Sequence, residues 1–491
     1  MCGRLHLATE AFMAWNRRYS VISYVRSSLW IVPILAVIAG IALKRVAEYI
    51  GAWLTTHHAY DLQHGFLAVN ADEAHSILDR IFTLNLSCLV FSFGSLLVAI
   101  QVAGGQYTPR IIATTLLRDN VIRWIVGLFV FSLLWTHRTM AELGQSTAVP
   151  QLQVFLATII GLASLVAFIL LIDYSARLMR PVSLIGRVAE QGFAVIQHIY
   201  PYAFDEEGVH AESDSYESES PAPQRSPVNA SVNDPSDGPT QIRHMVCYRG
   251  RSGVVLAVNL RGLAREARRM GCVVEFAVQV GDFIATDEPL FYLSGASIML
   301  SEAGEHRLQN LVALGTERTM EQDPMFAFRI EVDFALKALS PAINDPTTAV
   351  LAIDQLHRLL RLVGKRSLAN RTLNDEDGNP RVLFRTPDWV DYVHISFREI
   401  RQCGAGSLQI ERRLRAMIEN LMKTLPVPRH AALLGELELL DATIMRKHVF
   451  DADIALARIP DTQGLGGASA PAASTTNSDQ SVRKRVAHTT H

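Results

Sequence analysis

The stretch that decides the fold is FTLNLSCLVFSFGSLLVAIQVAGGQYTPR, which runs from Phe82 to Arg110. No side chain is charged from Phe82 to Ala103, and an uncharged apolar run of about 18 or more residues predicts a membrane-spanning helix. Only a helix satisfies its own backbone hydrogen bonds within lipid. The stretch also carries several polar side chains, so this helix either packs closely against other helices or lines an aqueous path.

Three further apolar runs accompany this stretch, from Leu29 to Leu43, from Trp124 to Trp135 and from Val154 to Ile172. Together the four runs predict a four-span transmembrane domain over residues 29–180, preceded by a cytosolic segment of residues 1–28. The first run is also short enough to be the apolar core of a signal peptide. Its long charged leader and the three spans after it favour an uncleaved helix.

Arginine and lysine residues beside the spans predict the orientation of the chain. If both termini are cytosolic, the inner flanks carry Arg17, Arg18, Arg26, Arg110, Arg118, Arg123, Arg177, Arg180 and Arg187. The outer flanks then carry Lys44, Arg45, Arg80 and Arg138. Because basic residues concentrate on the cytosolic side of membrane proteins, this excess predicts a multi-pass protein with both termini in the cytosol.

The composition agrees with a membrane protein that carries a soluble portion, since 49% of the 491 residues are hydrophobic and 19% are charged. The net charge of −2 indicates no general affinity for nucleic acids. The cysteines are Cys2, Cys88, Cys247, Cys272 and Cys403. Their spacing matches no metal or redox motif. We therefore expect no bound metal, no cofactor and no nucleic-acid partner.

After the spans, changes in composition divide the chain into five segments. These are a membrane-exit helix (181–204), a disordered acidic linker (205–240), a small β-module (241–295), a helical cytosolic domain (296–460) and a disordered tail (461–491). Helices are expected over 298–315, 324–339, 346–363, 388–402, 407–424 and 428–457. The expected fold is thus a membrane α-helical domain of four transmembrane helices, followed by an α+β cytosolic domain with a helical bundle.

Within the β-module, two runs rich in β-forming residues predict a hairpin. They extend from Val273 to Val280 and from Pro289 to Leu293, and Gly281 and Asp282 form the turn that is expected between them. The pattern resembles the strand–turn–strand of biotinyl-like barrel-sandwich domains. No lysine stands at the tip, so the resemblance implies no covalent biotin or lipoate.

Four short motifs occur together with the four spans. They are QYTPR (Gln106–Arg110), VGDF (Val280–Phe283), ERTMEQDPMFAFR (Glu317–Arg329) and ALSPAINDPTTA (Ala338–Ala349). This combination resembles the bacterial predicted membrane proteins grouped as domain of unknown function 2254, over about residues 25 to 425. The resemblance implies the architecture above and a location in the bacterial inner membrane. It implies no activity.

The second span carries the candidate functional residues of the membrane domain. Asn85, Cys88, Ser92 and Ser95 recur at spacings of three and four, so they share one helix face. With Gln101 they are the candidate pore-lining residues of an ion pathway, because uncharged polar groups can replace the hydration of an ion. The alternative is a packing face, since small and polar residues let spanning helices approach and hydrogen-bond.

The cytosolic exit of this span supplies further candidates, which are Gln106, Tyr107, Thr108 and Arg110. Gly104 and Gly105 are expected to end the helix, and Arg110 to anchor it at the lipid head groups. A gate or an ion-coordinating role for Gln101 and Gln106 is the alternative.

Two Asp-Pro pairs, Asp323-Pro324 and Asp345-Pro346, predict helix starts in the soluble region. Aspartate caps free N–H groups, and proline is tolerated at the first helical position. We expect Asp323 and Asp345 to be structural caps.

No nucleophile elbow, zinc-protease motif or phosphate-binding loop occurs in the sequence, so an enzyme is the least favoured class. The first hypothesis is a homo-oligomeric channel or permeation pathway lined by the second span. The alternative is a membrane-anchored sensor or scaffold whose cytosolic domain binds a partner or a small ligand. The expected partners are the lipid bilayer and further copies of the chain, while the ion that a channel would conduct stays open.

Overall fold

The computed structural model describes residues 15–16, 18–19, 30–56, 69–106, 119–144, 149–178, 180–204, 243–295, 301–368 and 372–464. The described residues form two compact units. Those of the first unit lie within Met1–Ile199, Ser218–Ile330 and Ala369–Thr386. Those of the second lie within Tyr200–Glu217, Glu331–Leu368 and Pro387–His491. The predicted acidic linker (205–240) and nearly all of the predicted tail lie outside the described residues.

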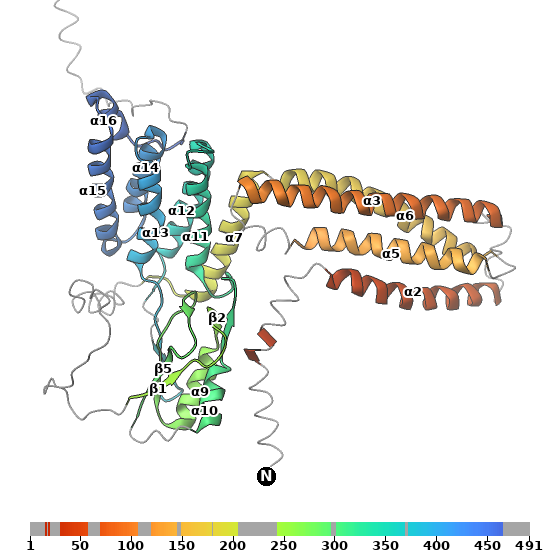
Figure 1. The fold of residues 1–491 in the computed structure, drawn as a ribbon, viewed down its shortest axis with the longest axis horizontal. Helices are drawn as coiled ribbons and strands as arrows, with labels where there is room; N and C mark the ends of the chain where they lie inside the picture. Colours follow the sequence, from red (N-terminus) through yellow and green to blue (C-terminus); the bar gives the residue numbers. More distant parts are fainter. Residues whose placement is uncertain are drawn as a thin grey trace, which may run out of the picture. The chain divides into compact units, whose positions relative to one another are not determined.

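The first unit contains four long helices, α2 (Ile31–Thr56), α3 (Ala71–Gln106), α5 (Asn120–Leu143) and α6 (Gln151–Leu178) (Figure 1). Of the described helices, α3, α5 and α6 are long and apolar enough to cross a membrane. The second, third and fourth predicted spans each lie within one of them. The first predicted span lies in α2 from Ile31 onward. The first 18 residues of α2 include Lys44, Arg45 and Glu48, so its membrane crossing stays a prediction.

Helix α3 is longer than the predicted span at both ends. Its 36 residues extend over about 54 Å, whereas the hydrocarbon core of a bilayer is about 30 Å thick. The added N-terminal turns begin with Asp72 and Glu73, which favour a helix start, and they bury Ala74 and Leu78. The helix also continues to Gln106, past the two glycines that were expected to end it.

Helix α5 contacts each of the other three long helices. Glycine permits two close approaches in this bundle. A Cβ atom on Gly127 of α5 would lie 2.9 Å from Cγ1 of Val32 on α2. A Cβ atom on Gly161 of α6 would lie 2.5 Å from Cγ2 of Ile81 on α3. Small residues at such crossings are typical of membrane helices, where close packing replaces the hydrophobic effect as the driving force.

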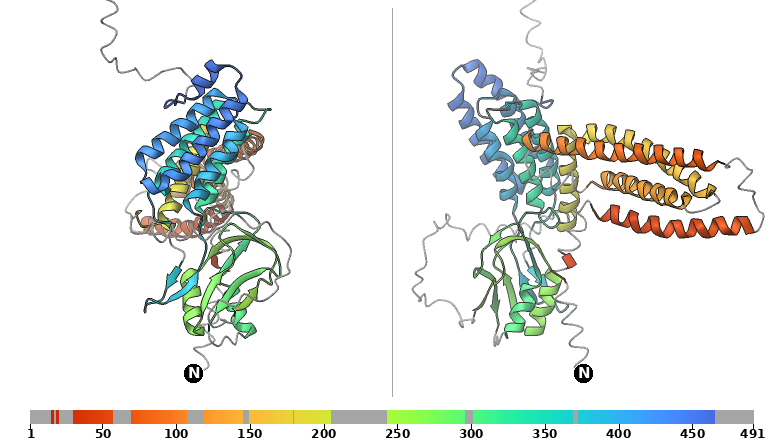
Figure 2. Two further views of the ribbon diagram at one scale, coloured as in Figure 1. Left: turned by 90° about the vertical axis from the view of Figure 1, so that its left-hand side faces the viewer. Right: turned by 45° about the vertical axis from the view of Figure 1, so that its right-hand side comes forward.

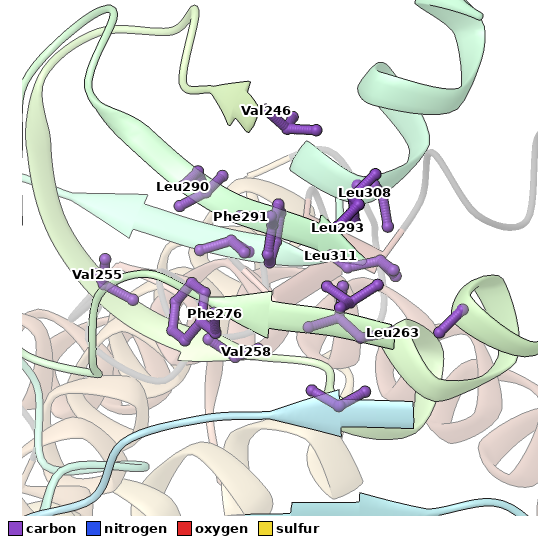
Figure 3. Packing of buried hydrophobic residues seen from close by; sticks show 14 of the residues in the cluster. Val246, Val255, Val258, Leu263, Phe276, Leu290, Phe291, Leu293, Leu308 and Leu311 are labelled. Atoms are coloured by element: carbon purple, nitrogen blue, oxygen red, sulfur yellow. The ribbon is translucent and has the colours of Figure 1, made fainter. Parts of the chain in front are cut away.

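A β-sandwich forms a second part of the first unit. Its strands are β1 (Arg243–Cys247), β2 (Gly253–Val258), β3 (Val273–Phe276), β4 (Phe283–Ile284), β5 (Pro289–Ser294), β6 (Val312–Gly315), β7 (Thr372–Asn374) and β8 (Pro380–Leu383). One sheet has the order β1-β5-β3-β8-β7, and the other has the order β4-β2-β6. Buried side chains of both sheets meet those of α9 (Leu260–Met270) and α10 (Glu302–Gln309) in one apolar core (Figure 3).

The two predicted strands of the hairpin do pair antiparallel, with Phe276 opposite Phe291. The predicted turn residues Gly281 and Asp282 do not join them directly, because β4 follows and pairs with β2 of the other sheet. The predicted helix over 298–315 is wrong in its second part, where β6 forms an edge of that sheet. Strand β8 also enters the β-sandwich, pairing parallel with β3.

The first unit also contains α7 (Pro181–Ile199), the predicted membrane-exit helix. The second unit is helical (Figure 2). Its helices are the end of α11 (Pro324–Ala338), α12 (Pro346–Val363), α13 (Trp389–Cys403), α14 (Leu408–Thr424), α15 (His430–Lys447) and α16 (Asp451–Ala457), with a 3-10 turn at Val427–Arg429. These bounds lie close to the predicted helices, except that the last predicted helix divides at residues 448–450.

Candidate functional site

The polar face of α3 is turned into the bundle at three of its candidate positions. Asn85 is 1% exposed, and its Nδ2 donates a hydrogen bond to Oγ of Ser132 on α5 at 2.8 Å. Cys88 and Ser92 are also buried, and Oγ of Ser92 donates to the carbonyl oxygen of Cys88 at 2.7 Å. Of these three, Asn85 joins α3 to α5, while the hydrogen bond of Ser92 stays within α3.

The other two candidates of α3, Ser95 and Gln101, are exposed within the single chain. Oγ of Ser95 donates to the carbonyl oxygen of Ser92 at 3.0 Å. The structure thus separates the five candidate residues into a buried group and an exposed pair. Gln106 is the last residue of α3, while Tyr107, Thr108 and Arg110 lie outside the described residues.

A polar cluster joins α5, α6 and α7. Asp119 caps α5, and its Oδ1 accepts hydrogen bonds from the backbone N–H groups of Val121 at 2.9 Å and Ile122 at 3.5 Å. Its Oδ2 accepts from the hydroxyl of Tyr174 on α6 and from the guanidinium of Arg187 on α7. Nη2 of Arg187 also donates to the hydroxyl oxygen of Tyr174 at 3.1 Å, which closes the network.

The electrostatics of this cluster, here called the Asp119 joint, follow from its burial. The Asp119 side chain is 3% exposed and that of Arg187 is 33% exposed. Burial by itself raises the pKa of the Asp119 carboxyl, but the hydrogen bonds from Tyr174 and Arg187 outweigh it and hold the pKa below its usual value. Asp119 therefore carries its charge at neutral pH, and the ends of α5, α6 and α7 are held together by a paired ion.

Sequence reasoning missed this cluster. The sequence Arg-Asp-Asn at 118–120 lies directly before an apolar run. This pattern is typical of a helix start and could have identified Asp119 as an N-cap. Nothing local identifies its partners, because Tyr174 and Arg187 stand 55 and 68 residues further along the chain.

A second group of contacts fixes the residues that follow α7. Tyr200, the residue after the helix, is buried in the second unit, and its hydroxyl lies 3.1 Å from that of Tyr392. The backbone N–H of Phe204 donates to the carbonyl oxygen of Lys365 at 2.9 Å. The guanidinium of Arg429 lies over the Phe204 ring, 4.8 Å from its centroid.

Backbone pairing strengthens this attachment. Ala203 forms an antiparallel bridge with Arg366, and Nη1 of Arg366 donates to the carbonyl oxygen of Pro201 at 3.0 Å. The N–H of Ser367 donates to the carbonyl oxygen of Tyr202 at 3.2 Å. This anchored segment, residues 200–204, begins directly after the last residue of α7, Ile199.

The two Asp-Pro motifs occupy helix starts. In the first unit, Oδ1 of Asp323 accepts from the N–H of Phe326 at 3.1 Å, and its Oδ2 pairs with the guanidinium of Arg318. Burial raises the pKa of the Asp323 carboxyl, although the hydrogen bond from Arg318 opposes this. In the second unit, Oδ1 of Asp345 accepts from the N–H of Thr348 at 3.1 Å and caps α12.

The Val-Gly-Asp-Phe and Gln-Asp-Pro motifs meet in the first unit. Gly281 has a φ of +95°, a left-handed conformation that favours glycine. A Cβ atom there would lie 2.6 Å from Oδ2 of Asp323 and closer still to the Arg318 guanidinium. Oε1 of Gln322 accepts from the N–H of Val258 on β2 at 2.9 Å. Both motifs therefore stabilise the attachment of the α11 start to the β-sandwich.

One buried acid stands apart from these structural roles. Glu331 on α11 is fully buried, and neither of its carboxylate oxygens has a hydrogen-bond partner among the described residues. Burial raises the pKa of the Glu331 carboxyl well above its usual value, because the charged form loses its hydration.

Three helices long and apolar enough to cross a membrane, followed by an α+β C-terminal region, are the features of a membrane protein. The chain matches the sequence profile of the family described as Predicted membrane protein (DUF2254) over residues 26–420, and it belongs to this family. The resemblance stated from the sequence motifs is thereby confirmed.

Two relatives extend over most of the chain. The uncharacterized protein Mb1321c of Mycobacterium bovis and the uncharacterized protein Rv1290c of Mycobacterium tuberculosis are each 21% identical to it over 449 residues. The alignments cover 90% of this chain and 81% of each relative. No solved structure matches the chain.

Proposed function

We propose that this protein is a non-catalytic signal-transmitting protein of the bacterial inner membrane. In this proposal its membrane helices sense a change in the bilayer, or a bound ligand, and α7 passes that change to the second unit. The observation that carries it is the way α7 is held, by the Asp119 joint near its start and by the segment 200–204 directly after its end.

The two attachments make α7 suited to this task. A helix of 19 residues is about 28 Å long and resists bending, so a rotation or shift at one end reaches the other. At the membrane end, the paired Asp119 and Arg187 couple α7 to the ends of α5 and α6. Directly after its other end, Tyr200 is buried in the second unit. To transmit a signal between two regions, a structural element must contact both regions and have two alternative positions.

The membrane placement in this proposal includes α2 as a fourth span and both termini in the cytosol. The excess of arginine on the predicted inner flanks supports it. The ion pair between Lys44 of α2 and Glu142 of α5 supports it as well, because the charge of Lys44 is neutralised where the side chain is buried in the bundle.

The test is hydrogen exchange on the full chain in lipid nanodiscs, comparing Arg187→Gln with Arg177→Gln. Arg177 is the matched control, since it is exposed on α6 and pairs with Asp173, one turn away on the same helix. Transmission predicts that Arg187→Gln speeds exchange at residues 200–204 and at 365–367 as well as in α7. The proposal fails if faster exchange stays confined to the helix ends around Asp119, or if both variants behave alike.

A homo-oligomeric channel is the second candidate, and it is favoured by the exposed face of α3. Ser87, Gly94 and Gln101 recur every seven residues on this face, and a Cβ atom on Gly94 would meet nothing within 4 Å. Small and polar residues at this spacing suit contact with a second membrane helix. Several copies of the chain could then surround a pathway.

This candidate is tested by mass photometry and by planar-bilayer recording of Gly94→Leu, with Gly186→Leu on α7 as the matched control. Gly186 also has open space at its Cβ position. The channel predicts discrete conductance and an oligomer for the natural chain, both lost in Gly94→Leu alone. A monomeric natural chain that stays silent across voltages would refute it.

A further inference from the structure

Helix α15 of the second unit exposes apolar side chains along its outer face. The helix packs against α13 and α14, and its buried apolar side chains are Leu433, Leu440 and Ile444 (Figure 1). Most of the large apolar side chains that are exposed on the described part of this unit lie on α15 or directly beside it. They are 42–87% exposed, and they are Val427, Leu434, Leu439, Met445, Val449 and Phe450. Such an accumulation marks a surface that contacts another molecule.

The centre of this face consists mainly of small residues. Five exposed residues recur at spacings of four and three and form one stripe along the helix, namely Ala431, Gly435, Glu438, Ala442 and Met445. A Cβ atom on Gly435 would meet nothing within 4 Å. Because three of the five side chains are no larger than a methyl group, a second helix can approach the backbone of α15 closely.

The charged side chains Glu438 and Arg446 are exposed on this face and have opposite signs. Glu438 lies four residues before Ala442, and Arg446 lies four residues after it. Neither has an ion-pair partner among the described residues. If a second α15 runs antiparallel to the first, with a two-fold axis at Ala442, each Glu438 lies at the same height as Arg446 of the other copy. The same axis brings Val449 of one copy near Gly435 of the other. The face is therefore complementary to itself.

We propose that α15 is a dimerisation surface, which binds α15 of a second copy of this chain in the antiparallel orientation. The exposed apolar side chains present roughly 200–450 Å², whereas a stable dimer in solution buries about 800 Å² per partner. Two copies held in one bilayer meet at a high effective concentration, so a smaller contact is sufficient there. The contact involves neither α3 nor α7, which makes it separate from both functions considered above.

The experiment is disulfide cross-linking of the full chain in native membrane vesicles, with copper phenanthroline as the oxidant. All variants also carry Cys403→Ser, since Cys403 is the exposed cysteine of those described. Ala442→Cys should cross-link to a dimer, because the two-fold axis places its two copies side by side. Lys447→Cys is the matched control, since Lys447 is exposed on the same helix but lies off the stripe and away from the axis.

A mixture of Glu438→Cys and Arg446→Cys chains, each with its own tag, tests the orientation. An antiparallel pair joins the two different variants to one another. Each variant by itself should stay monomeric, because its two cysteines are separated by about 12 Å along the helix axis. A parallel pair would instead join each variant to itself.

An exchange of charges tests the complementarity. In the Ala442→Cys chain, Arg446→Glu should lower the cross-linked fraction about fivefold, the factor expected for two exposed ion pairs. Glu438→Arg added to it should restore the dimer, and Gly94→Leu on α3 should leave the dimer unchanged. The proposal is overturned if Ala442→Cys cross-links no more than Lys447→Cys, or if Glu438→Cys and Arg446→Cys each cross-link alone. It is also overturned if the charge exchange restores nothing or if Gly94→Leu abolishes the dimer.

Discussion

Removal of the charge at Asp119 is the perturbation that most directly tests how the membrane helices are held together. Asp119→Asn keeps a side-chain oxygen that can cap α5, but it abolishes the ion pair with Arg187. A hydrogen bond to a charged partner contributes about 1.5–3 kcal/mol. Since Arg187 is one-third exposed, water screens part of this, and we expect a loss of about 1–2 kcal/mol. Asp119→Ala also loses the cap, which adds about 1 kcal/mol.

The assay is unfolding of the purified chain in mild detergent by an increasing fraction of sodium dodecyl sulfate, followed by tryptophan fluorescence. A double-mutant cycle isolates the pair. Asp119→Asn with Arg187→Gln should fall short of additivity by about 1 kcal/mol. The same change with Arg177→Gln should be additive within about 0.5 kcal/mol, because Arg177 pairs with Asp173 instead.

The pH dependence has a definite sign. The pKa of Asp119 is lower in the folded chain than in the unfolded chain, so its contribution is fully present at neutral pH. It declines as the pH falls below the unfolded value of about 3.9 and through the folded one. Asp119→Asn should therefore lose less stability than the natural chain between about pH 5 and about pH 3. If both chains lose the same stability on acidification, or if Asp119→Asn and Arg187→Gln are additive, the ion pair between Asp119 and Arg187 does not stabilise the bundle.

Three further changes test the soluble parts by the same unfolding measurement. Glu331→Gln should weaken the dependence of the free energy of unfolding on pH. Because the pKa of Glu331 is raised in the folded chain, the natural chain loses about 1.4 kcal/mol per pH unit above the pKa of the unfolded chain. The same dependence on pH in both chains would contradict this prediction. Gly281→Ala should cost more than Gly378→Ala, because both have positive φ but only Gly281 lacks space for a Cβ atom. Asp345→Ala should cost about 1 kcal/mol and Asp345→Asn little, as expected for a cap.

Local chemistry explains which parts of the fold could be predicted. The second, third and fourth spans followed from the length of apolar runs, and the starts of α11 and α12 followed from Asp-Pro pairs. Both signals lie in one continuous stretch of sequence. Strands β6 and β8 could not be predicted in this way. Each has four residues, and β8 acquires its partner β3 from about a hundred residues earlier in the chain.

The candidate site shows the same limit. The polar residues of α3 were identified by helical periodicity, but periodicity cannot say that Asn85 faces Ser132 on α5 while Gln101 faces outward. The Asp119 joint depends on three helix ends that meet only once the bundle has formed.

The interleaving of the two units along the chain has a consequence for biosynthesis. Strands β7 and β8 complete the larger sheet of the first unit, yet α12 of the second unit precedes them in the sequence. A ribosome therefore releases α12 before the sheet can close at Leu383. Neither unit can be finished before part of the other has emerged, so the two must mature together. A stop codon anywhere before β8 would leave the β-sandwich open, with the edge of β3 exposed to other nascent chains.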